Sequence, residues 1–443
     1  MFFIKLKKTV MIIPGVSYML IVRNMLKVRN MLKVRNKLSV SYMIRPVGIL
    51  YLVVLFCFGT VSCKNNGQPD SVYDRGVEHG IIYYEEGRYA GWPANNGIWS
   101  WDNNEILVGF SEGEHDASRG FHTLKSGTAS SKYARSTDGG ITWTIEDAYE
   151  NGQITQGIDG RKAGQITRLT ESIDDFTDPD FIFTFRRYNS HYGPSYFYYS
   201  KNRGKKWIGP YEFPDLGTPG VATRTDYIVN GQQELGAFLT VGKSDRKEGR
   251  VAYARTEDGA LNWELVSYVG PEPVGFDIMP SSLRLSSNEL ITTIRTRNHV
   301  YDYSLAIQDS IVIDRRDPIT SYTSKDNGRN WEQLPDPVAC TGYGGSPPAL
   351  VRLDDGRLAL GYIYRSANGS RVNVKFSSDN GRTWGCEVML REDGANRDTG
   401  YPVMVQRPDG KLVMIYYWNN ALQEGAKPYR YLAYTLFDPE MWE

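Results

Sequence analysis

The sequence predicts an all-β protein, a six-bladed β-propeller of four-stranded antiparallel blades. Five copies of one turn motif recur at intervals of 53 to 68 residues, which indicates an array of similar supersecondary units. No long amphipathic helix is indicated after residue 70, where short strand-like runs alternate with Gly, Asp and Asn turns. The 443 residues include 44 Gly, and 13% are aromatic, which suits an all-β protein with a large core.

The turn motif is most complete in YARSTDGGITWT, residues 133–144. An Asp or Asn can accept hydrogen bonds from the backbone just after it, and Gly adopts a positive φ without penalty, so the motif predicts a tight turn between two strands. The Trp that follows supplies a large apolar surface for packing against the body of the protein. The central Asp or Asn of the five copies is Asp138, Asn202, Asp258, Asp326 and Asp379. We interpret these turns as structural rather than catalytic.

Each turn follows two earlier strand-like runs, which predicts a unit of four strands. In the fifth unit these runs are PPALVRL and RLALGYIYR, joined by an Asp-Asp-Gly turn. After the fifth turn, YPVMVQRPDGKLVMIYYWN and RYLAYTLF supply three strands of a sixth unit. We expect GIIYYE (80–85) to supply its fourth strand, because a blade shared by both ends of the chain closes a propeller without long open edges.

The N-terminal part predicts an export signal ahead of the propeller. Met43 opens a stretch with a basic start, an apolar run and small residues before Cys63, the layout of a secretory signal. The ending TVSC resembles a bacterial lipoprotein signal, in which Cys63 would carry the lipid. The alternatives are a plain signal peptide and an N-terminal membrane anchor.

The expected boundaries follow from this reading. They are 1–42 for upstream translation, 43–62 for the lipoprotein-type signal peptide, 63–76 for a linker and 77–443 for the propeller. We expect an exported protein, in the periplasm or on the outer membrane of a Gram-negative bacterium, that touches the membrane only through its lipid anchor.

Composition limits the partners. Residues 1–62 hold ten of the 51 basic residues and no acidic one, so the rest carries a net charge of about −10, which argues against nucleic acid. No Gly-rich phosphate loop and no His or Cys spacing for a metal is present, so no cofactor and no metal are implied. Cys340 and Cys386 could form a disulfide or stay as two buried thiols. We expect a monomer.

Arginines recur where strands should reach the central mouth of a propeller. They are Arg88, Arg186, Arg187, Arg224, Arg295, Arg297, Arg365 and Arg397. Several guanidinium groups in one cleft repel each other unless an anion lies between them, and Arg holds a carboxylate with two parallel bonds. The pattern predicts a sugar acid as ligand, unless these arginines pair with local acids.

The repeated Ser-x-Asp-x-Gly-x-Thr-Trp turns resemble the Asp-box, or BNR, repeats of the sialidase (neuraminidase) superfamily of six-bladed propellers. The resemblance covers residues 77–443. It implies a glycoside hydrolase acting on glycans, with an arginine triad for the substrate carboxylate. It also implies a Tyr nucleophile paired with a Glu, and an Asp as general acid/base.

Positions carried over from the resemblance give candidate site residues. DTGYPVMV places Tyr401 as the nucleophile, and the loop GFSEGEHDASRG places Asp116 as the acid/base, with Glu112, Glu114 and His115 as rivals. TTIRTR offers Arg297 or Arg295 for the triad, and YIYR offers Arg365. Arg187, Arg224 and Arg397 complete the expected substrate-binding set.

The sequence departs from the family pattern at two places. The opening Arg-Ile-Pro is replaced by Gly91-Trp92-Pro93, with Arg88 three residues earlier. The Glu that should activate the tyrosine is absent from GFDIMPSS, where Asp277 is the substitute. We therefore expect an activity related to sialic-acid hydrolysis rather than ordinary sialidase activity.

Two other functions fit the same propeller. The run RRYNSHYG brings Arg187, Tyr188 and His191 close in sequence, which would suit a polysaccharide lyase that works by β-elimination. A glycan-binding propeller without catalysis is consistent with the missing Arg and Glu.

Overall fold

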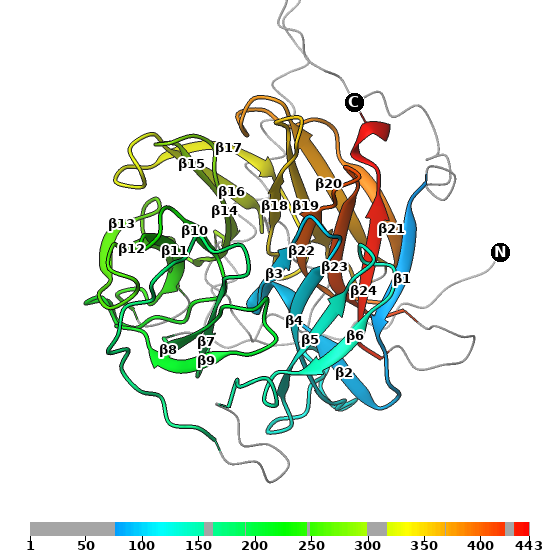
Figure 1. Cartoon of the computed structure of the whole chain (residues 1–443). Coiled ribbons are helices and arrows are strands. Elements are labelled where there is room, and N and C mark those ends of the chain that lie inside the picture. Colours follow the sequence, from blue (N-terminus) through cyan, green and yellow to red (C-terminus); the bar gives the residue numbers. More distant parts are fainter. Residues whose placement is uncertain are drawn as a thin grey trace, which may run out of the picture. The chain divides into compact units, whose positions relative to one another are not determined.

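The computed structural model describes residues 76–154, 163–190, 192–245, 249–298, 317–367, 369–420 and 429–442. The expected signal segment, Cys63 and His191 lie outside these residues. The described residues form six antiparallel sheets around one axis, so the predicted all-β six-bladed propeller is confirmed (Figure 1).

The first three blades follow the chain from the start of the propeller. Blade 1 contains β2 (Arg88–Gly91), β3 (Ile98–Ser100), β4 (Ile106–Glu114), β5 (Ser130–Ser136) and β6 (Thr144–Asp147), with a 3-10 turn, η3 (Pro93–Asn95), between β2 and β3. Blade 2 contains β7 (Ile182–Arg187), β8 (Ser195–Ser200) and β9 (Ile208–Glu212). Blade 3 contains β10 (Tyr227–Val229), β11 (Leu235–Val241), β12 (Arg250–Thr256) and β13 (Glu264–Tyr268).

The other three blades have four strands each. Blade 4 contains β14 (Phe276–Arg284), β15 (Leu290–Arg297), β16 (Ile319–Ser324) and β17 (Glu332–Val338). Blade 5 contains β18 (Ala349–Arg352), β19 (Leu358–Tyr364), β20 (Ser370–Ser377) and β21 (Val388–Gly394). Blade 6 contains β22 (Gly400–Gln406), β23 (Leu412–Trp418), β24 (Tyr431–Phe437) and β1 (Glu78–Tyr83), and η5 (Pro439–Met441) follows β24.

Blade 6 is closed by the N-terminal strand, as the sequence predicts. β1 pairs antiparallel with β24 from Glu78 opposite Leu436 to Tyr83 opposite Leu432. The outer edge of the last blade is thereby formed by the start of the propeller, and the ring joins without a covalent link at that point. Figure 1 shows β1 in blue alongside β24 in red.

The core lies between neighbouring blades. The second strand of each of blades 3 to 6 is buried along its whole length or nearly so, because each sheet packs a neighbour on both faces. One apolar cluster joins blades 5 and 6 through Ile363 of β19 and Met404 and Trp418 of blade 6. Another joins blades 2 and 3 through Phe183 and Leu239. Interior strands that are covered on both faces need continuous apolar runs, as in LVMIYYW of β23.

The five predicted turns share one hydrogen-bond pattern, and each joins the last two strands of its blade. In blade 1 the Ser136 hydroxyl donates to Asp138 at 2.7 Å and accepts from the Gly140 N–H, while Asp138 accepts from the Thr142 N–H at 2.9 Å. The same bonds recur around Asn202, Asp258, Asp326 and Asp379. The turns are therefore local structural units.

The structure also bears on the pairing of the cysteines and on membrane-spanning helices. Cys340 is a free cysteine, so it does not bond to Cys386. Within the described residues, no helix has the length and apolar character needed to cross a membrane.

Candidate functional site

The central cavity lies at the mouth of the propeller, where the ends of strands from several blades meet. Arg187 ends β7, Arg295 and Arg297 end β15, and Tyr401 begins β22, and all four line one cavity of about 700 Å³. Arg224, just before β10, lines it as well. Side chains that are remote in sequence thus meet at the axis, as the propeller predicts.

Three residues at or next to the central cavity have a left-handed backbone conformation and directly precede a proline. Trp92, Met279 and Tyr401 have φ values of 58°, 55° and 54°. The ladder register shifts at this point in β14 and β22, and the shift aims each side chain toward one shared cluster that includes Tyr401. Such a conformation costs about 1–3 kcal/mol per non-glycine residue, and strain of this kind concentrates at functional sites.

Positive charge dominates the central cavity. Seven cationic side chains line it: Arg119, Lys125, Arg187, Arg224, Arg295, Arg297 and Arg397. Among the described residues that line it, none is Asp or Glu. A cavity with this charge favours an anionic ligand.

Tyr401 is buried at the floor of the central cavity, with 7% of its surface exposed. The Arg295 guanidinium lies 3.5 Å from its hydroxyl, and the Arg365 guanidinium lies 5.3 Å from its ring centre. Burial raises the pKa of Tyr401, but the charges of Arg295, Arg365 and Arg224 outweigh burial and bring the pKa below its ordinary value of 10. The surroundings therefore make the Tyr401 hydroxyl more acidic than an ordinary tyrosine.

Two arginines are held with little neutralising charge. Arg365 is 1% exposed, and its Nε donates to the Thr399 carbonyl at 2.8 Å. Both of its terminal nitrogens are buried without a hydrogen-bond partner among the described residues. Burial and the neighbouring charge of Arg186 lower the pKa of Arg187 to about 10. The unsatisfied terminal nitrogens of the buried Arg365 are costly, which is consistent with a bound anion.

His122 and Asp398 form a polar pair beside Tyr401. His122 Nδ1 lies 3.6 Å from Asp398 and accepts a hydrogen bond from the Trp92 indole at 3.3 Å. The His122 ring lies edge-on to Tyr401, with ring centres 6.2 Å apart. Asp398 is fully buried and bonds to Arg430 and Tyr417.

The pKa values of this pair move in the same direction. Burial lowers the pKa of His122, as do Arg365 and Arg295, although Asp398 opposes them. Burial raises the pKa of Asp398, but its bond with His122 and the charge of Arg430 hold the pKa well below the usual range. Both shifts favour a neutral imidazole beside an ionised carboxylate.

The carboxylates predicted for catalysis are not brought to Tyr401. Asp116 accepts bonds from the Ser118 N–H and hydroxyl, which lower its pKa, and it does not line the central cavity. A lowered pKa is the wrong direction for a general acid near neutral pH. Its rivals are also engaged elsewhere, because Glu112 pairs with Arg88 and Glu114 pairs with Lys125.

Asp277 faces away from the central cavity. Its neighbours Phe276 and Ile278 line the cavity, so strand alternation puts Asp277 on the opposite face. It is 4% exposed, accepts from the Thr296 hydroxyl at 2.6 Å, and has its pKa raised to about 6 by burial. The substitution expected for the missing Glu is not supported by this geometry.

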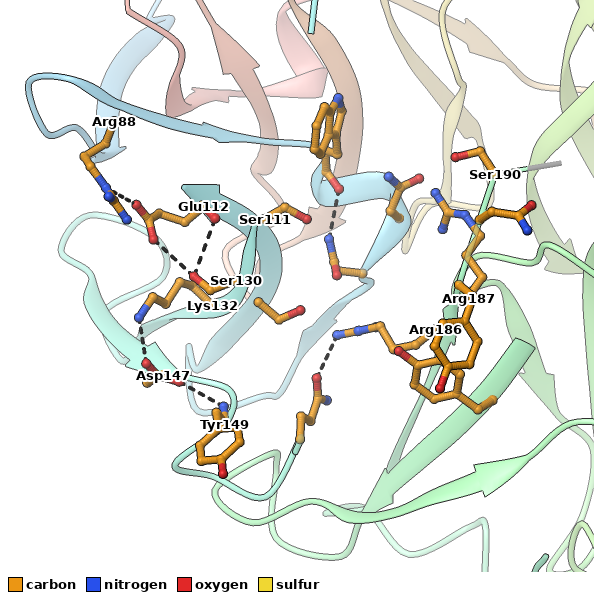
Figure 2. Close-up of a pocket in the computed structure, with 18 residues that line it drawn as sticks. Arg88, Ser111, Glu112, Ser130, Lys132, Asp147, Tyr149, Arg186, Arg187 and Ser190 are labelled. Carbon is orange, nitrogen blue, oxygen red and sulfur yellow. Dashed lines mark hydrogen bonds and ion pairs between the residues drawn. The ribbon is translucent and has the colours of Figure 1, made fainter. Parts of the chain in front are cut away.

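The predicted arginines divide between two places. Arg397 lies in the central cavity, where its guanidinium stacks on Tyr343 at 3.6 Å. Arg297 lies 3.7 Å from Asp317 and also stacks on Phe276. Arg88 instead bonds to Glu112 at 2.5 Å in a separate side pocket between blades 1 and 2 (Figure 2). Arg88 therefore does not replace the missing triad arginine in the central cavity.

Several cavity residues were not found from the sequence. His122 lies in a loop without a recognisable motif, and Asp398 precedes the predicted Tyr401 by three residues. The DTGY run could have directed attention to Asp398, but only the fold brings His122 to it. Asn95, which accepts from Arg224 at 3.1 Å, belongs to η3, a 3-10 turn inside the stretch GWPANNGIWSW that the sequence predicts as a strand-like run.

Comparisons with known proteins support the fold. No protein-family model matches the chain, and no curated protein matches it. A protein of unknown function from Dyadobacter fermentans is similar, with a TM-score of 0.57 and 18% identity over 82% of this chain and 98% of its own. The intramolecular trans-sialidase from Ruminococcus gnavus is similar with a TM-score of 0.50 and 12% identity, over 78% and 94% of the two chains. The chain therefore has a sialidase-like propeller fold.

Proposed function

We propose that the protein is a glycoside hydrolase that removes a terminal acidic sugar, or a related sugar, from glycans. The observation that carries this proposal is the central cavity, where seven cationic side chains and no described carboxylate surround a buried tyrosine. The fold is similar to that of a trans-sialidase, which adds support at the level of architecture. The ligand chemistry comes from the charge, because a sugar carboxylate can bind several guanidinium groups at once.

Tyr401 is the proposed nucleophile. A phenol is neutral when protonated, so it can approach an anomeric carbon that carries a carboxylate without charge repulsion. The Arg295 and Arg365 charges favour loss of its proton, which lessens the need for a Glu partner. Attack by the tyrosine oxygen would form a bond to the anomeric carbon as the glycosidic bond breaks, with the phenol proton passing to the departing oxygen, and water would then release the sugar.

His122 is the proposed proton-transfer group. Among the described residues that line the central cavity, it alone has an ordinary pKa near neutral pH. Its neutral ring can exchange a proton with a substrate through Nε2, while Asp398, 3.6 Å from Nδ1, would stabilise the imidazolium. The competing assignment is the one made from the sequence, in which Asp116 is the general acid/base.

A substrate panel tests the proposed function. Aryl glycosides of sialic acid and of uronic acids, with neutral glycosides as controls, should show release of the aryl group for an acidic member. A rise in ultraviolet absorbance from an unsaturated product would instead indicate a lyase, and binding without release would indicate a glycan-binding propeller. Binding without release is favoured by one observation, the absence of a described carboxylate beside the Tyr401 hydroxyl.

The two proton-transfer assignments are separated by a matched pair of variants. His122→Gln should lower kcat by about 100-fold, within the range for loss of a general acid or base, and flatten the acidic limb of the pH profile. Asp116→Asn should leave kcat within twofold. The reverse result would restore the assignment made from the sequence and remove His122 from the mechanism.

A further inference from the structure

Another cavity, the axial pocket, lies farther along the first strands of the blades than the central cavity does. It has a volume of about 330 Å³. Residues of η3 and β3, residues at the start of β10, and residues of β14, β18 and β22 or directly before them line it. Figure 1 shows these strands around the centre of the ring. The axial pocket is therefore built by the same ring of strands as the central cavity.

The two cavities use different residues of these strands. Tyr401 lines the central cavity, whereas Pro402 and Val403 line the axial pocket. In β14, Ile278 lines the central cavity and Ser281 lines the axial pocket. No described residue lines both cavities. A ligand of the axial pocket is therefore bound by a separate set of side chains.

The axial pocket has one carboxylate and no cation. Among the described residues that line it, Asp226 is the single Asp or Glu, and none is Arg, Lys or His. The Ser282 hydroxyl donates to Asp226 Oδ2 at 2.8 Å. Asp226 is partly exposed in the pocket, and burial raises its pKa to about 7. Once ionised, Asp226 puts a negative charge into a pocket where no described lining residue balances it.

Other charged groups on the neighbouring elements do not reach this carboxylate. Arg224, two residues before Asp226, lines the central cavity instead. Arg284 of β14 and Arg352 of β18 donate to backbone carbonyls at 2.9 Å and 2.8 Å, and neither lines the axial pocket. Tyr227 does line it, but burial raises the pKa of its phenol, which keeps it neutral. The charge of the pocket therefore depends on Asp226.

Aromatic and apolar side chains form most of the remaining wall. The Trp99 indole donates to the Tyr227 hydroxyl at 2.9 Å, and both side chains line the pocket. Aromatic rings attract cations, and a carboxylate beside them adds a charge-assisted hydrogen bond. The apolar part of the wall includes Pro280, Pro348, Leu350, Pro402 and Met404. This combination suits an ammonium group that carries a short hydrocarbon chain.

A divalent metal ion fits the axial pocket less well than an organic cation. Calcium takes six to eight oxygen ligands, and magnesium requires an octahedral set. The axial pocket supplies one carboxylate, and among the described residues no group of three or more His, Cys, Asp or Glu could hold a metal.

We propose that the axial pocket binds a small organic cation, an alkylammonium, through the carboxylate of Asp226. The ammonium donates to Asp226, and its hydrocarbon chain lies against the prolines and aliphatic side chains of the wall. This site is independent of the proposed hydrolase activity, because the central cavity has the opposite charge and shares no described lining residue with it.

A titration with n-butylammonium, followed by saturation-transfer NMR, tests the proposal. The wild-type protein should bind it at least about tenfold more tightly than n-butanol, the neutral control, because only the ammonium pairs with the carboxylate. Asp226→Asn should lower the affinity about tenfold, equal to about 1.4 kcal/mol, since the amide keeps an acceptor for Ser282 but loses the charge. Absence of binding, equal binding of n-butanol, or equal affinity in the variant would overturn the proposal.

Two further variants locate the bound cation. Asp102→Asn removes an exposed carboxylate outside the axial pocket, and this matched control should leave the affinity within about twofold. Val403→Phe keeps the Asp226 carboxylate but narrows the pocket, and it should weaken binding about tenfold. Thermal unfolding checks that each variant is folded. A folded Val403→Phe variant with wild-type affinity would place the ligand elsewhere and overturn the proposal.

The pH dependence of binding identifies the carboxylate. Asp226 loses its proton around pH 7, so the affinity of the wild-type protein should rise about tenfold from pH 6 to pH 8. An alkylammonium keeps its charge over this range, as a lysine side chain does. Asp226→Asn should show no such rise. A flat profile for the wild-type protein would indicate a carboxylate with an ordinary pKa and would remove Asp226 from the site.

Discussion

The peripheral turns and the central cavity both contain polar and charged side chains, but they differ in whether nearby groups satisfy them. In each turn a carboxylate or amide is fully engaged by groups within four residues of it, as Asp138 is by Ser136 and Thr142. In the central cavity, cations come from separate blades, and Arg365, which lies behind Tyr401 and does not line the cavity, keeps two nitrogens without a hydrogen-bond partner among the described residues. The turns are complete on their own, whereas the cavity is electrostatically complete only with an anion.

This difference separates stability from function. The turns join outer strands and contribute to folding, and the central cavity concentrates like charges and left-handed backbone, which lower stability. Substitutions in the two regions should therefore have opposite effects on stability and activity. Turn variants should lose stability and keep activity, and cavity variants should lose activity and keep stability.

The sharpest test of the cavity is Tyr401→Phe, which removes one hydroxyl and keeps the ring. We expect kcat for the acidic glycoside to fall by about 1,000-fold or more, because the nucleophile is lost, with the melting temperature unchanged within about 2 °C. Initial rates and thermal unfolding check both parts. A variant that turns over at the wild-type rate would show that Tyr401 is only a wall of the cavity.

Arg397→Gln tests the charge of the cavity without removing a buried ion pair. It should raise KM for the acidic glycoside about tenfold, because one cation near the sugar carboxylate is lost, and the effect should shrink as salt increases. Arg371→Gln is the matched control, since Arg371 also stacks on a tyrosine, Tyr364 at 4.6 Å, but does not line the central cavity. Similar changes in KM for both variants would argue against a specific carboxylate site.

The sequence predicted what depends on neighbours along the chain. The turns, their spacing and the shared sixth blade follow from residues close in sequence, or from the count of strands that a closed ring requires. The gathering of Arg187, Arg224 and Arg297 at one cavity followed once the propeller was assumed. Their roles in binding stay a prediction.

The sequence did not predict what depends on packing between blades. Arg295 and Tyr401, 106 residues apart, were both expected at the central mouth, but the 3.5 Å approach of the guanidinium to the hydroxyl follows only from the packing of the blades. Asp277 was assigned by its distance from a proline, although period-two alternation with Phe276 and Ile278 turns it away from the cavity. His122 was missed because its partner Asp398 is brought to it only by the closure of the ring.

Asp277→Asn should separate a structural carboxylate from a catalytic one. The folded pKa of about 6 lies above the ordinary 3.8, so the folded protein prefers the protonated acid, and stability falls as pH rises from about 4 to about 6. The difference corresponds to about 3 kcal/mol at pH 7, which the amide should recover because it still accepts from Thr296. Urea unfolding at pH 4 and pH 7 measures this, and a variant that lost activity while folded would return Asp277 to the mechanism.

The turns should yield the smallest effect, and one confined to stability. Asp138→Ala removes the acceptor of the Thr142 N–H and hydroxyl bonds and should cost about 1–2 kcal/mol of unfolding free energy. Burial raises the pKa of Asp138, but its hydrogen bonds with Thr142 and Ser136 outweigh burial and lower the pKa to about 2. The bonds therefore stabilise the protein above the unfolded pKa of about 4 and are lost as pH falls toward 2, so the variant should differ less from the wild type at pH 3 than at pH 7.

Asp102→Ala, which removes an exposed carboxylate in blade 1, is the control and should change stability by less than about 0.5 kcal/mol. If Asp138→Ala instead lowered kcat/KM with stability unchanged, the turns would have a direct role in function, and the separation between the periphery and the axis would fail.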